Sequence, residues 1–317
     1  MKTLIIGRGL LGSSLKKELS ENGEIVSTNN RILWDDEQLV EDSFNTLIQS
    51  FFTVSPSDGW RIYWCAGNSS PASILDTPNA EVLMLKKLIY HIKMHSKKSK
   101  GTFIYSSSAG GIYSSSNEII DEFSDVKVTS AYGACKLEAE NVAMELASVE
   151  TVKILIARIS TLYGPGQNLL KKQGIITQLS LSVLTGRPQL IYVPMDTMRD
   201  YLYVNDCAKK MIKAVTILEK MSFSKNNLPI VTKIFASGQS SSISQIVSKI
   251  DSNMFRKSKL LFRDDPLLNN QFFDSKVMCE ADSINLTPMH EGISHLINDV
   301  RDQLLFDPAS GINVAIQ

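Results

Sequence analysis

Residues 2–12 read KTLIIGRGLLG. Five residues rich in aliphatic and β-branched side chains end at Gly7, and a helical pattern of apolar residues begins at Leu10. The arrangement predicts a short strand, a GxGxxG turn made by Gly7, Gly9 and Gly12, and the first turn of a helix. Such glycines allow a tight turn and a close approach of the backbone to a pyrophosphate, which the helix amino terminus then attracts. The stretch predicts a dinucleotide site; a glycine-rich turn without a ligand is the alternative.

Strand and helix patterns alternate through the first half of the chain. Strands are expected at 2–6, 24–28, 61–66, 102–106 and 152–158, with a very short one at 32–34. Helices are expected at 10–22, 37–52, 80–95 and 130–147. This alternation predicts an α/β fold with a Rossmann-like, doubly wound parallel sheet that helices cover on both faces. After residue 163 helices and loops dominate, with a late β pattern at 230–235.

Composition excludes several classes of protein. The chain has 317 residues, with 33 basic and 33 acidic side chains, so no basic surplus favours nucleic acid or an anionic membrane. No apolar run reaches the roughly 18 residues of a membrane span, and the glycines at 7 and 9 interrupt any signal-peptide core. The four cysteines are far apart and form no CxxC pair. We expect a cytoplasmic protein without disulfides.

The choice of dinucleotide depends on residues near position 30. An NAD site usually places a carboxylate about 20 residues after the glycines, but here the sequence is Thr-Asn-Asn-Arg at 28–31. Arg31, next to Asn30, and Arg8 inside the glycine turn can hold a 2′-phosphate through their planar, permanently charged groups. NADP(H) is therefore favoured, and NAD(H) is the alternative. Asp35 or Asp36 is expected near the adenine or as an exposed helix cap.

A second motif combines a tyrosine and a lysine. Tyr132 and Lys136 are four residues apart on a predicted helix, so both lie on one helical face. A nearby ammonium favours the phenolate form, which suits proton transfer to or from a carbonyl or alcohol oxygen. Ser107 and Ser108 follow a predicted strand, at the edge of a parallel sheet where ligands bind. A serine there can bond the reacting oxygen, or it can simply cap a turn.

Taken together, these motifs resemble the extended short-chain dehydrogenase/reductase family, also called the NAD-dependent epimerase/dehydratase family, which acts on nucleotide sugars. The motifs that carry the resemblance are GRGLLG at 7–12, WCAG at 64–67, SSAGGIY at 107–113, YGACK at 132–136, RISTLYGPG at 158–166 and RDYLYVND at 199–206. Their order along the chain matches the family across most of its length.

The resemblance implies a role for each matched residue. Tyr132 matches the catalytic acid/base, Lys136 the lysine that holds the nicotinamide ribose, and Ser108 the active-site hydroxyl, with Ser107 as the alternative one residue earlier. Arg199 matches an arginine that contacts the substrate diphosphate. The residues implied to lie beside the cofactor are Gly7, Arg8, Gly9, Leu10, Leu11, Gly12, Ala66 and Gly67. Thr161 stands where the family often has an asparagine, which puts one substrate contact in doubt.

The resemblance also implies a division into domains. Residues 1–163 would form the dinucleotide-binding domain, rejoined by segments near 199–216 and 230–238. Residues 164–198 and 239–317 would form a smaller, mostly C-terminal substrate-binding domain. A homodimer through the helices at 80–95 and 130–147 is expected.

No metal site is expected, because His290 and His295 are five residues apart, and because His91 and His95, taken as a surface or interface pair, have no third ligand. The favoured reaction is reduction of a nucleotide-linked 4-keto-6-deoxy sugar. The alternatives are 4-epimerisation with the cofactor regenerated, a catalytically inactive dinucleotide-binding sensor, and a structural partner that uses only the fold.

Overall fold

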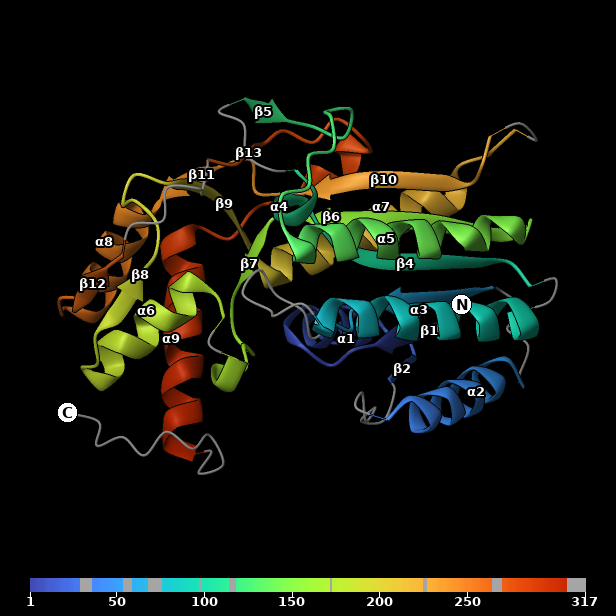
Figure 1. The fold of residues 1–317 in the computed structure, drawn as a ribbon, viewed down its shortest axis with the longest axis horizontal. Coiled ribbons are helices and arrows are strands. Elements are labelled where there is room, and N and C mark those ends of the chain that lie inside the picture. The colour runs from blue at the N-terminus through green and yellow to red at the C-terminus, as the bar shows by residue number, and fades with distance from the viewer. Residues whose placement is uncertain are drawn as a thin grey trace.

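A computed structural model describes residues 1–28, 36–53, 59–67, 76–96, 99–113, 118–171, 173–224, 227–263 and 270–306 (Figure 1). Its larger part is a sheet of six parallel strands in the order β10-β6-β4-β3-β1-β2. The strands are β1 (Lys2–Ile6), β2 (Val26–Thr28), β3 (Trp60–Trp64), β4 (Gly101–Ser108), β6 (Val152–Ile159) and β10 (Ile230–Phe235). The predicted parallel sheet is confirmed, and so is the late strand at 230–235.

Helices cover both faces of this sheet, as its alternating side chains require. Leu4 and Ile6 point to one face and Ile5 to the other, and all three are fully buried. The helices on the Leu4 face are α2 (Glu37–Thr53), α3 (Asp76–Ser96) and α5 (Ala131–Met144). The helices on the Ile5 face are α1 (Leu10–Glu21) and α7 (Val204–Lys220). The fold is therefore a doubly wound, Rossmann-like α/β sheet.

A second apolar core lies beyond the carboxyl ends of these strands. It is shared by α6 (Ile175–Thr185), α8 (Ile243–Met254), α9 (Met289–Phe306) and a small sheet in the order β11-β9-β7. These three strands are β7 (Thr161–Tyr163), β9 (Met198–Tyr203) and β11 (Ser240–Ser242). Two further pairs are β8 (Gln189–Ile191) with β12 (Leu260–Phe262) and β5 (Ile119–Ile120) with β13 (Phe272–Phe273). The short helical turns are α4 (Ala109–Ile112), η1 (Glu145–Ser148), η2 (Leu169–Lys171) and η3 (Cys279–Asp282).

Sequence patterns missed most of the small strands. A run of two or three residues is too short to show a period-2 pattern, so β5, β7, β8 and β11–β13 went unpredicted. The six-residue strand β9 was not predicted either, and helices after residue 163 were expected without bounds. The elements predicted in the first half of the chain differ from expectation mainly at their ends: α3 begins at Asp76 rather than at 80, and β3 ends at Trp64 rather than at 66. The possible strand at 32–34 lies outside the described residues. Within the described ranges, no helix combines the length and the apolar character that crossing a bilayer requires.

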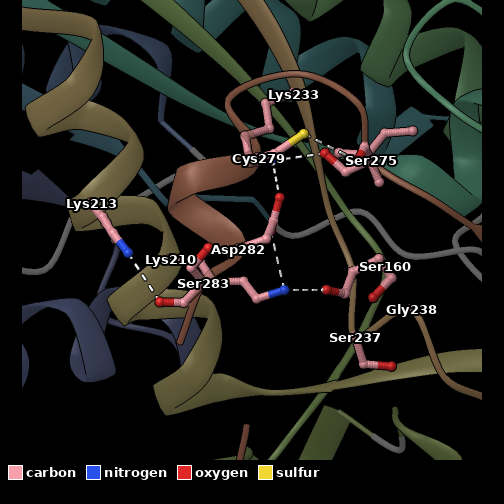
Figure 2. A network of polar contacts seen from close by, with 12 residues as sticks. Ser160, Lys210, Lys213, Lys233, Ser237, Gly238, Ser275, Cys279, Asp282 and Ser283 are labelled. Carbon is pink, nitrogen blue, oxygen red and sulfur yellow. Dashed lines mark hydrogen bonds and ion pairs between the residues drawn. The ribbon is translucent and has the colours of Figure 1, made fainter. Parts of the chain in front are cut away.

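A buried polar cluster ties residues 275–282 to the large sheet (Figure 2). Lys233, on β10, is fully buried and donates to Ser275 Oγ and the Val277 carbonyl, each at 2.7 Å, and to Asp282 Oδ2 at 2.6 Å. The other carboxylate oxygen of Asp282 lies 3.2 Å from Nζ of Lys210, on α7. One carboxylate therefore balances two buried ammonium groups from two elements. We call this group of residues the Asp282 cluster.

Candidate active site

The glycine turn has the shape that a pyrophosphate needs. Gly7 has φ +103°, and a Cβ there would lie 2.4 Å from the backbone nitrogen of Ala66. A Cβ on Gly12 would lie 1.9 Å from the Gly7 carbonyl oxygen, so only glycine allows α1 to pack this closely. Around a Cβ at Gly9, by contrast, the structure has no atom within 4 Å. Backbone at Gly9 is thus open to a ligand at the amino terminus of α1, which fits a dinucleotide phosphate.

The other residues expected at the cofactor differ in how far they are exposed. Arg8 is exposed, Leu11 is buried, and Ala66 packs against Gly7 at the end of β3. Asn30, Arg31 and Asp35 lie outside the described residues. Asp36 is exposed and accepts hydrogen bonds from the backbone N–H groups of residues 38 and 39, each at 3.0 Å. Asp36 is therefore the cap of α2, one of the two roles expected for it.

Ser108 and Tyr132 meet over the backbone of Gly111. A Cβ on Gly111 would lie 2.9 Å from a ring carbon of Tyr132 and 3.3 Å from Ser108 Oγ. Ser108 caps the short helix α4, accepting from the N–H of Gly111 at 3.2 Å. Tyr132 is half-buried in the first turn of α5, where Ser130 is the cap. The structure thus places Ser108 Oγ and an edge of the Tyr132 ring on the same side of Gly111, beyond β4.

Ser107 has a different environment from its neighbour. It is buried and donates to Glu140 Oε1 at 2.6 Å. Glu140 is fully buried and also accepts from Nε and Nη2 of Arg158, at 2.9 and 2.7 Å. Arg158 completes the network by donating to Tyr113 Oη at 2.5 Å. Ser107 therefore belongs to a buried ionic network between β4, β6 and α5.

Lys136 has a partner that no sequence motif predicted. Its buried ammonium forms an ion pair with Glu81 of α3, whose side chain is only 4% exposed. Burial by itself would lower the pKa of Lys136, but Tyr105, Glu81 and Tyr132 together raise it well above its usual value. The Lys136 nitrogen lies 5.8 Å from the centroid of the Tyr132 ring. Glu81 precedes Lys136 by 55 residues and lies on another helix, so no local spacing signals the pair.

The residues expected at the substrate lie on the small sheet. Thr161 and Arg199 are half-buried, on β7 and β9, and Arg199 Nη1 donates to the Met198 carbonyl at 2.9 Å. Burial lowers the pKa of Arg199. The neighbouring Asp200, which sequence reasoning did not single out, is buried and accepts from Ser160 Oγ at 2.6 Å. It also accepts from the Ser237 hydroxyl and the Gly238 N–H, each at 2.8 Å, and so fixes the loop after β10 against β9.

The histidines serve structural contacts. His91 was expected on a surface or at an interface; it is buried between α2 and α3, with Nε2 2.6 Å from Glu41 Oε1. His295 Nδ1 lies 3.1 Å from Tyr203 Oη. In the part of the chain that the structure describes, no three His, Cys, Asp or Glu side chains form a group that could hold a metal ion.

Comparison with known proteins adds a family and a set of relatives. The family model described as "NAD dependent epimerase/dehydratase family" matches residues 3–224. A dTDP-4-dehydro-6-deoxyglucose reductase of Escherichia coli is 25% identical over 202 residues, 62% of this chain and 61% of that protein. An uncharacterized UDP-glucose epimerase, YtcB, of Bacillus subtilis is 26% identical over 180 residues, 57% of this chain and 52% of that protein. The chain thus covers less than two thirds of the length of these relatives.

Two solved structures share the fold along nearly the whole chain. The Thermus thermophilus UDP-glucose 4-epimerase in complex with NAD superposes with a TM-score of 0.78 at 17% identity, covering 95% of this chain and 99% of that one. MoeE5 in complex with UDP-glucose and NAD gives a TM-score of 0.76 at 18% identity, covering 96% of this chain and 100% of that one. At such low identity the likeness concerns the fold.

Proposed function

The chain belongs to the NAD-dependent epimerase/dehydratase family, and from that premise we propose that it is a nicotinamide-dependent oxidoreductase that reduces a nucleotide-linked 4-keto-6-deoxy sugar. The observation that carries the proposal is the meeting of Ser108 and Tyr132 over Gly111, with the Lys136 ammonium close behind the phenol. A phenol and a hydroxyl that converge on one point can serve one reacting oxygen. The reductase of Escherichia coli among the relatives supports this choice of reaction.

The cofactor would bind along the glycine turn, whose open backbone at Gly9 fits a pyrophosphate. Gly7, Arg8, Leu10, Leu11 and Gly12 would surround the phosphates, and Ala66, Gly67 and Lys136 the nicotinamide end. When bound, the cofactor supplies the hydride. The solved relatives in complex with NAD support a nicotinamide dinucleotide.

The chain's own groups would manage the proton and the charge. Tyr132 would protonate the oxygen of the sugar carbonyl as it gains negative charge, and Ser108 would donate a hydrogen bond to the same oxygen. Arg199 would hold the diphosphate, since a guanidinium binds two phosphate oxygens at once. Thr161 would line the sugar site. Ser107 would act indirectly, because its hydroxyl is committed to Glu140.

We further propose that residues 1–163, with the segments 199–216 and 230–238, form the cofactor domain, and that 164–198 and 239–317 form the substrate domain. The nucleotide sugar would bind between the two. The small sheet that carries Thr161 and Arg199 lies at that junction, which supports the division.

The deciding experiment offers NADPH with 4-keto-6-deoxy nucleotide sugars and follows NADPH absorbance together with the stereochemistry of the product. Stoichiometric loss of NADPH is the expected result. Interconversion of two nucleotide hexoses without net change in cofactor would instead establish 4-epimerisation, which the named epimerases among the relatives favour as the second candidate. Binding of cofactor without any turnover would point to a sensor.

The proposed preference for NADP(H) rests on Arg8, Arg31 and the missing carboxylate near position 30. Replacing Arg31 with alanine should weaken NADPH binding by about 1.5–3 kcal/mol, the usual value of a charge-assisted hydrogen bond, and should leave NADH binding nearly unchanged. Calorimetric titration with both cofactors tests this. Equal weakening of both would refute the 2′-phosphate argument.

A further inference from the structure

The ion pair between Lys136 and Glu81 joins two elements at the centre of the candidate site. Lys136 lies on α5 and Glu81 on α3, and both side chains are more than nine-tenths buried. Two charges removed from water are costly unless they face each other, so the pair is held firmly. Loss of either partner would leave the other charged and buried.

The Glu81 carboxylate also touches the segment expected beside the cofactor. A Cβ placed on Gly67 would lie 3.0 Å from Glu81 Oε2 and 3.4 Å from Oε1. Gly67 follows β3, at the same edge of the sheet as the glycine turn. The Glu81 carboxylate therefore pairs with the lysine and also occupies the space into which a side chain at position 67 would project.

We propose that Glu81 is a positioning residue: it holds the Lys136 ammonium beside Tyr132, ready for the cofactor ribose, and it offsets the positive charge that Tyr132 experiences. The inference rests on the proposed function, since it assigns Lys136 to the ribose and Tyr132 to the proton. A lysine has four rotatable side-chain bonds, and a fixed counter-charge removes that freedom before the ligand arrives.

The groups facing this pair come from two elements. From α5 come Tyr132, Cys135 and Lys136 itself, and from β4 comes Tyr105, whose ring centroid is 5.7 Å from the Lys136 nitrogen. Burial, followed by the charge of Glu81, raises the pKa of Cys135 to about 11, so this thiol is neutral at working pH. The charge of Glu138, on α5, acts on Cys135 in the same direction, but this carboxylate is exposed and pairs with Lys86. Glu81 is thus the buried carboxylate that pairs with Lys136, and its removal leaves the ammonium without this partner.

The first test measures cofactor affinity without turnover. Glu81→Gln keeps the size of the side chain and removes its charge, and we expect the dissociation constant of NADPH to rise roughly tenfold. The matched control is Glu219→Gln. Glu219 forms an ion pair with the buried Arg61 at 2.7 Å, at the opposite end of β3, and its replacement should leave the dissociation constant unchanged.

The second test is rescue by a conservative variant. Glu81→Asp keeps the negative charge on a shorter side chain, so it should restore the dissociation constant of NADPH in part, whereas Glu81→Gln should not. The turnover number and the Michaelis constant for NADPH, measured in both variants, separate a loss of cofactor affinity from a loss of rate. A purely structural role would lower the stability of the variants and leave the dissociation constant of NADPH unchanged.

A double variant protects the test against misfolding. Glu81→Gln with Lys136→Met removes both buried charges and should fold even if the single variant does not. If Glu81 acts through Lys136, the double variant binds NADPH as Lys136→Met alone does. Three results would overturn the inference. The first is a weaker affinity for NADPH in the double variant than in Lys136→Met. The others are a dissociation constant of NADPH in Glu81→Gln that is unchanged, or one that is lower because Lys136 has lost a competing partner. Failure of Tyr132→Phe to slow turnover would instead count against the proposed function, and the affinity measurements would still stand.

Discussion

At the scale of the residue, the site is held together by the backbone of Gly111. A Cβ at Gly111 would lie within 3.3 Å of both Ser108 Oγ and the Tyr132 ring, so a side chain at that position would separate the two groups. Gly133, in the first turn of α5, has a related part, because a Cβ there would lie 2.1 Å from the Gly111 carbonyl oxygen. Small residues on both sides allow α5 to deliver Tyr132 to Ser108.

Tyr132→Phe tests the proton transfer directly. The ring keeps its packing and loses only its hydroxyl, so we expect turnover to fall by about 10²–10⁴-fold with little change in the dissociation constant of the cofactor. Steady-state rates and calorimetry check the two halves of this statement. The control is Tyr192→Phe, the same change at an exposed tyrosine directly after β8. Turnover within a few-fold of wild type would remove Tyr132 from its proposed role.

The sequence allowed the prediction of residues whose function needs a fixed local spacing. Gly7, Gly9 and Gly12 follow such a rule. The structure explains it, because a Cβ at Gly7 or Gly12 would lie within 3 Å of neighbouring backbone atoms, whereas the space around a Cβ at Gly9 is open. Glu81 and Asp200 could not be predicted in this way. Glu81 is separated from Lys136 by 55 residues, and Asp200 from the loop it fixes by 37 or 38, and no local pattern reports such partners.

At the scale of the element, buried ion pairs decide how peripheral segments attach to the sheet. The Asp282 cluster attaches η3 to β10 and α7, while Glu41 attaches α2 to α3 through Lys87 and His91. Both groups of ion pairs join elements whose apolar faces are already buried, so they fix the position of these elements in addition to their packing. Removing either group should lower the free energy of unfolding.

Asp282→Asn removes the single carboxylate that balances Lys210 and Lys233. Two buried ammonium groups would then lack a counter-charge, and we expect the free energy of unfolding to fall by about 3 kcal/mol. Urea denaturation followed by circular dichroism measures the change. Asp274→Asn, the same substitution in an exposed pair with Lys276, should leave stability nearly unchanged. Equal effects of the two variants would contradict the account.

The Glu41 tie should depend on pH. The hydrogen bond from Lys87, opposed in part by burial and aided by His91, holds the pKa of Glu41 below its usual 4.5. A carboxyl group with a lowered pKa in the folded state stabilises the fold above pH 4.5, and this contribution is lost as the pH falls through its folded-state value. Glu41→Gln should therefore reduce stability by about 1 kcal/mol at neutral pH, with a difference from wild type that shrinks below pH 4.5.

Denaturant titrations of both proteins across that range measure this dependence. Glu21→Gln, at an exposed pair with Lys17 on α1, is the control and should show no comparable trend. A difference between wild type and Glu41→Gln that stays constant down to pH 4 would exclude the ionised carboxylate as the cause.

At the scale of the whole molecule, α3 and α5 lie side by side and form one long face of the part that contains the six-stranded sheet (Figure 1). Lys86 and Lys93 of α3 pair with Glu138 and Glu145, at 3.3 and 3.0 Å. Along α3 the apolar side chains of Leu83, Tyr90 and Met94 are also exposed, at 39%, 57% and 59%. We propose that a second copy of this chain covers this face in an isologous contact of two helices from each copy, as the homodimer expected from the sequence requires.

Tyr90→Lys tests that assembly. Charge at the centre of an apolar contact opposes association, so we expect the variant to sediment as a monomer at micromolar concentration where the wild type sediments as a dimer. Tyr192→Lys, at the exposed tyrosine after β8, should leave the sedimentation of the protein as a dimer unchanged. A monomeric wild type would refute the homodimer.

The position of β10 late in the chain determines when the large sheet can be completed during synthesis. β6 is complete at Ile159, but β10, which hydrogen-bonds along its whole length, arrives only with residues 230–235, and the carboxylate that Lys233 requires comes later still, at Asp282. A chain emerging from the ribosome therefore carries an apolar strand with unpaired backbone groups through the production of the entire intervening segment. Nascent chains halted in that interval should depend on chaperones and aggregate without them, whereas chains complete through α9 should fold without such help.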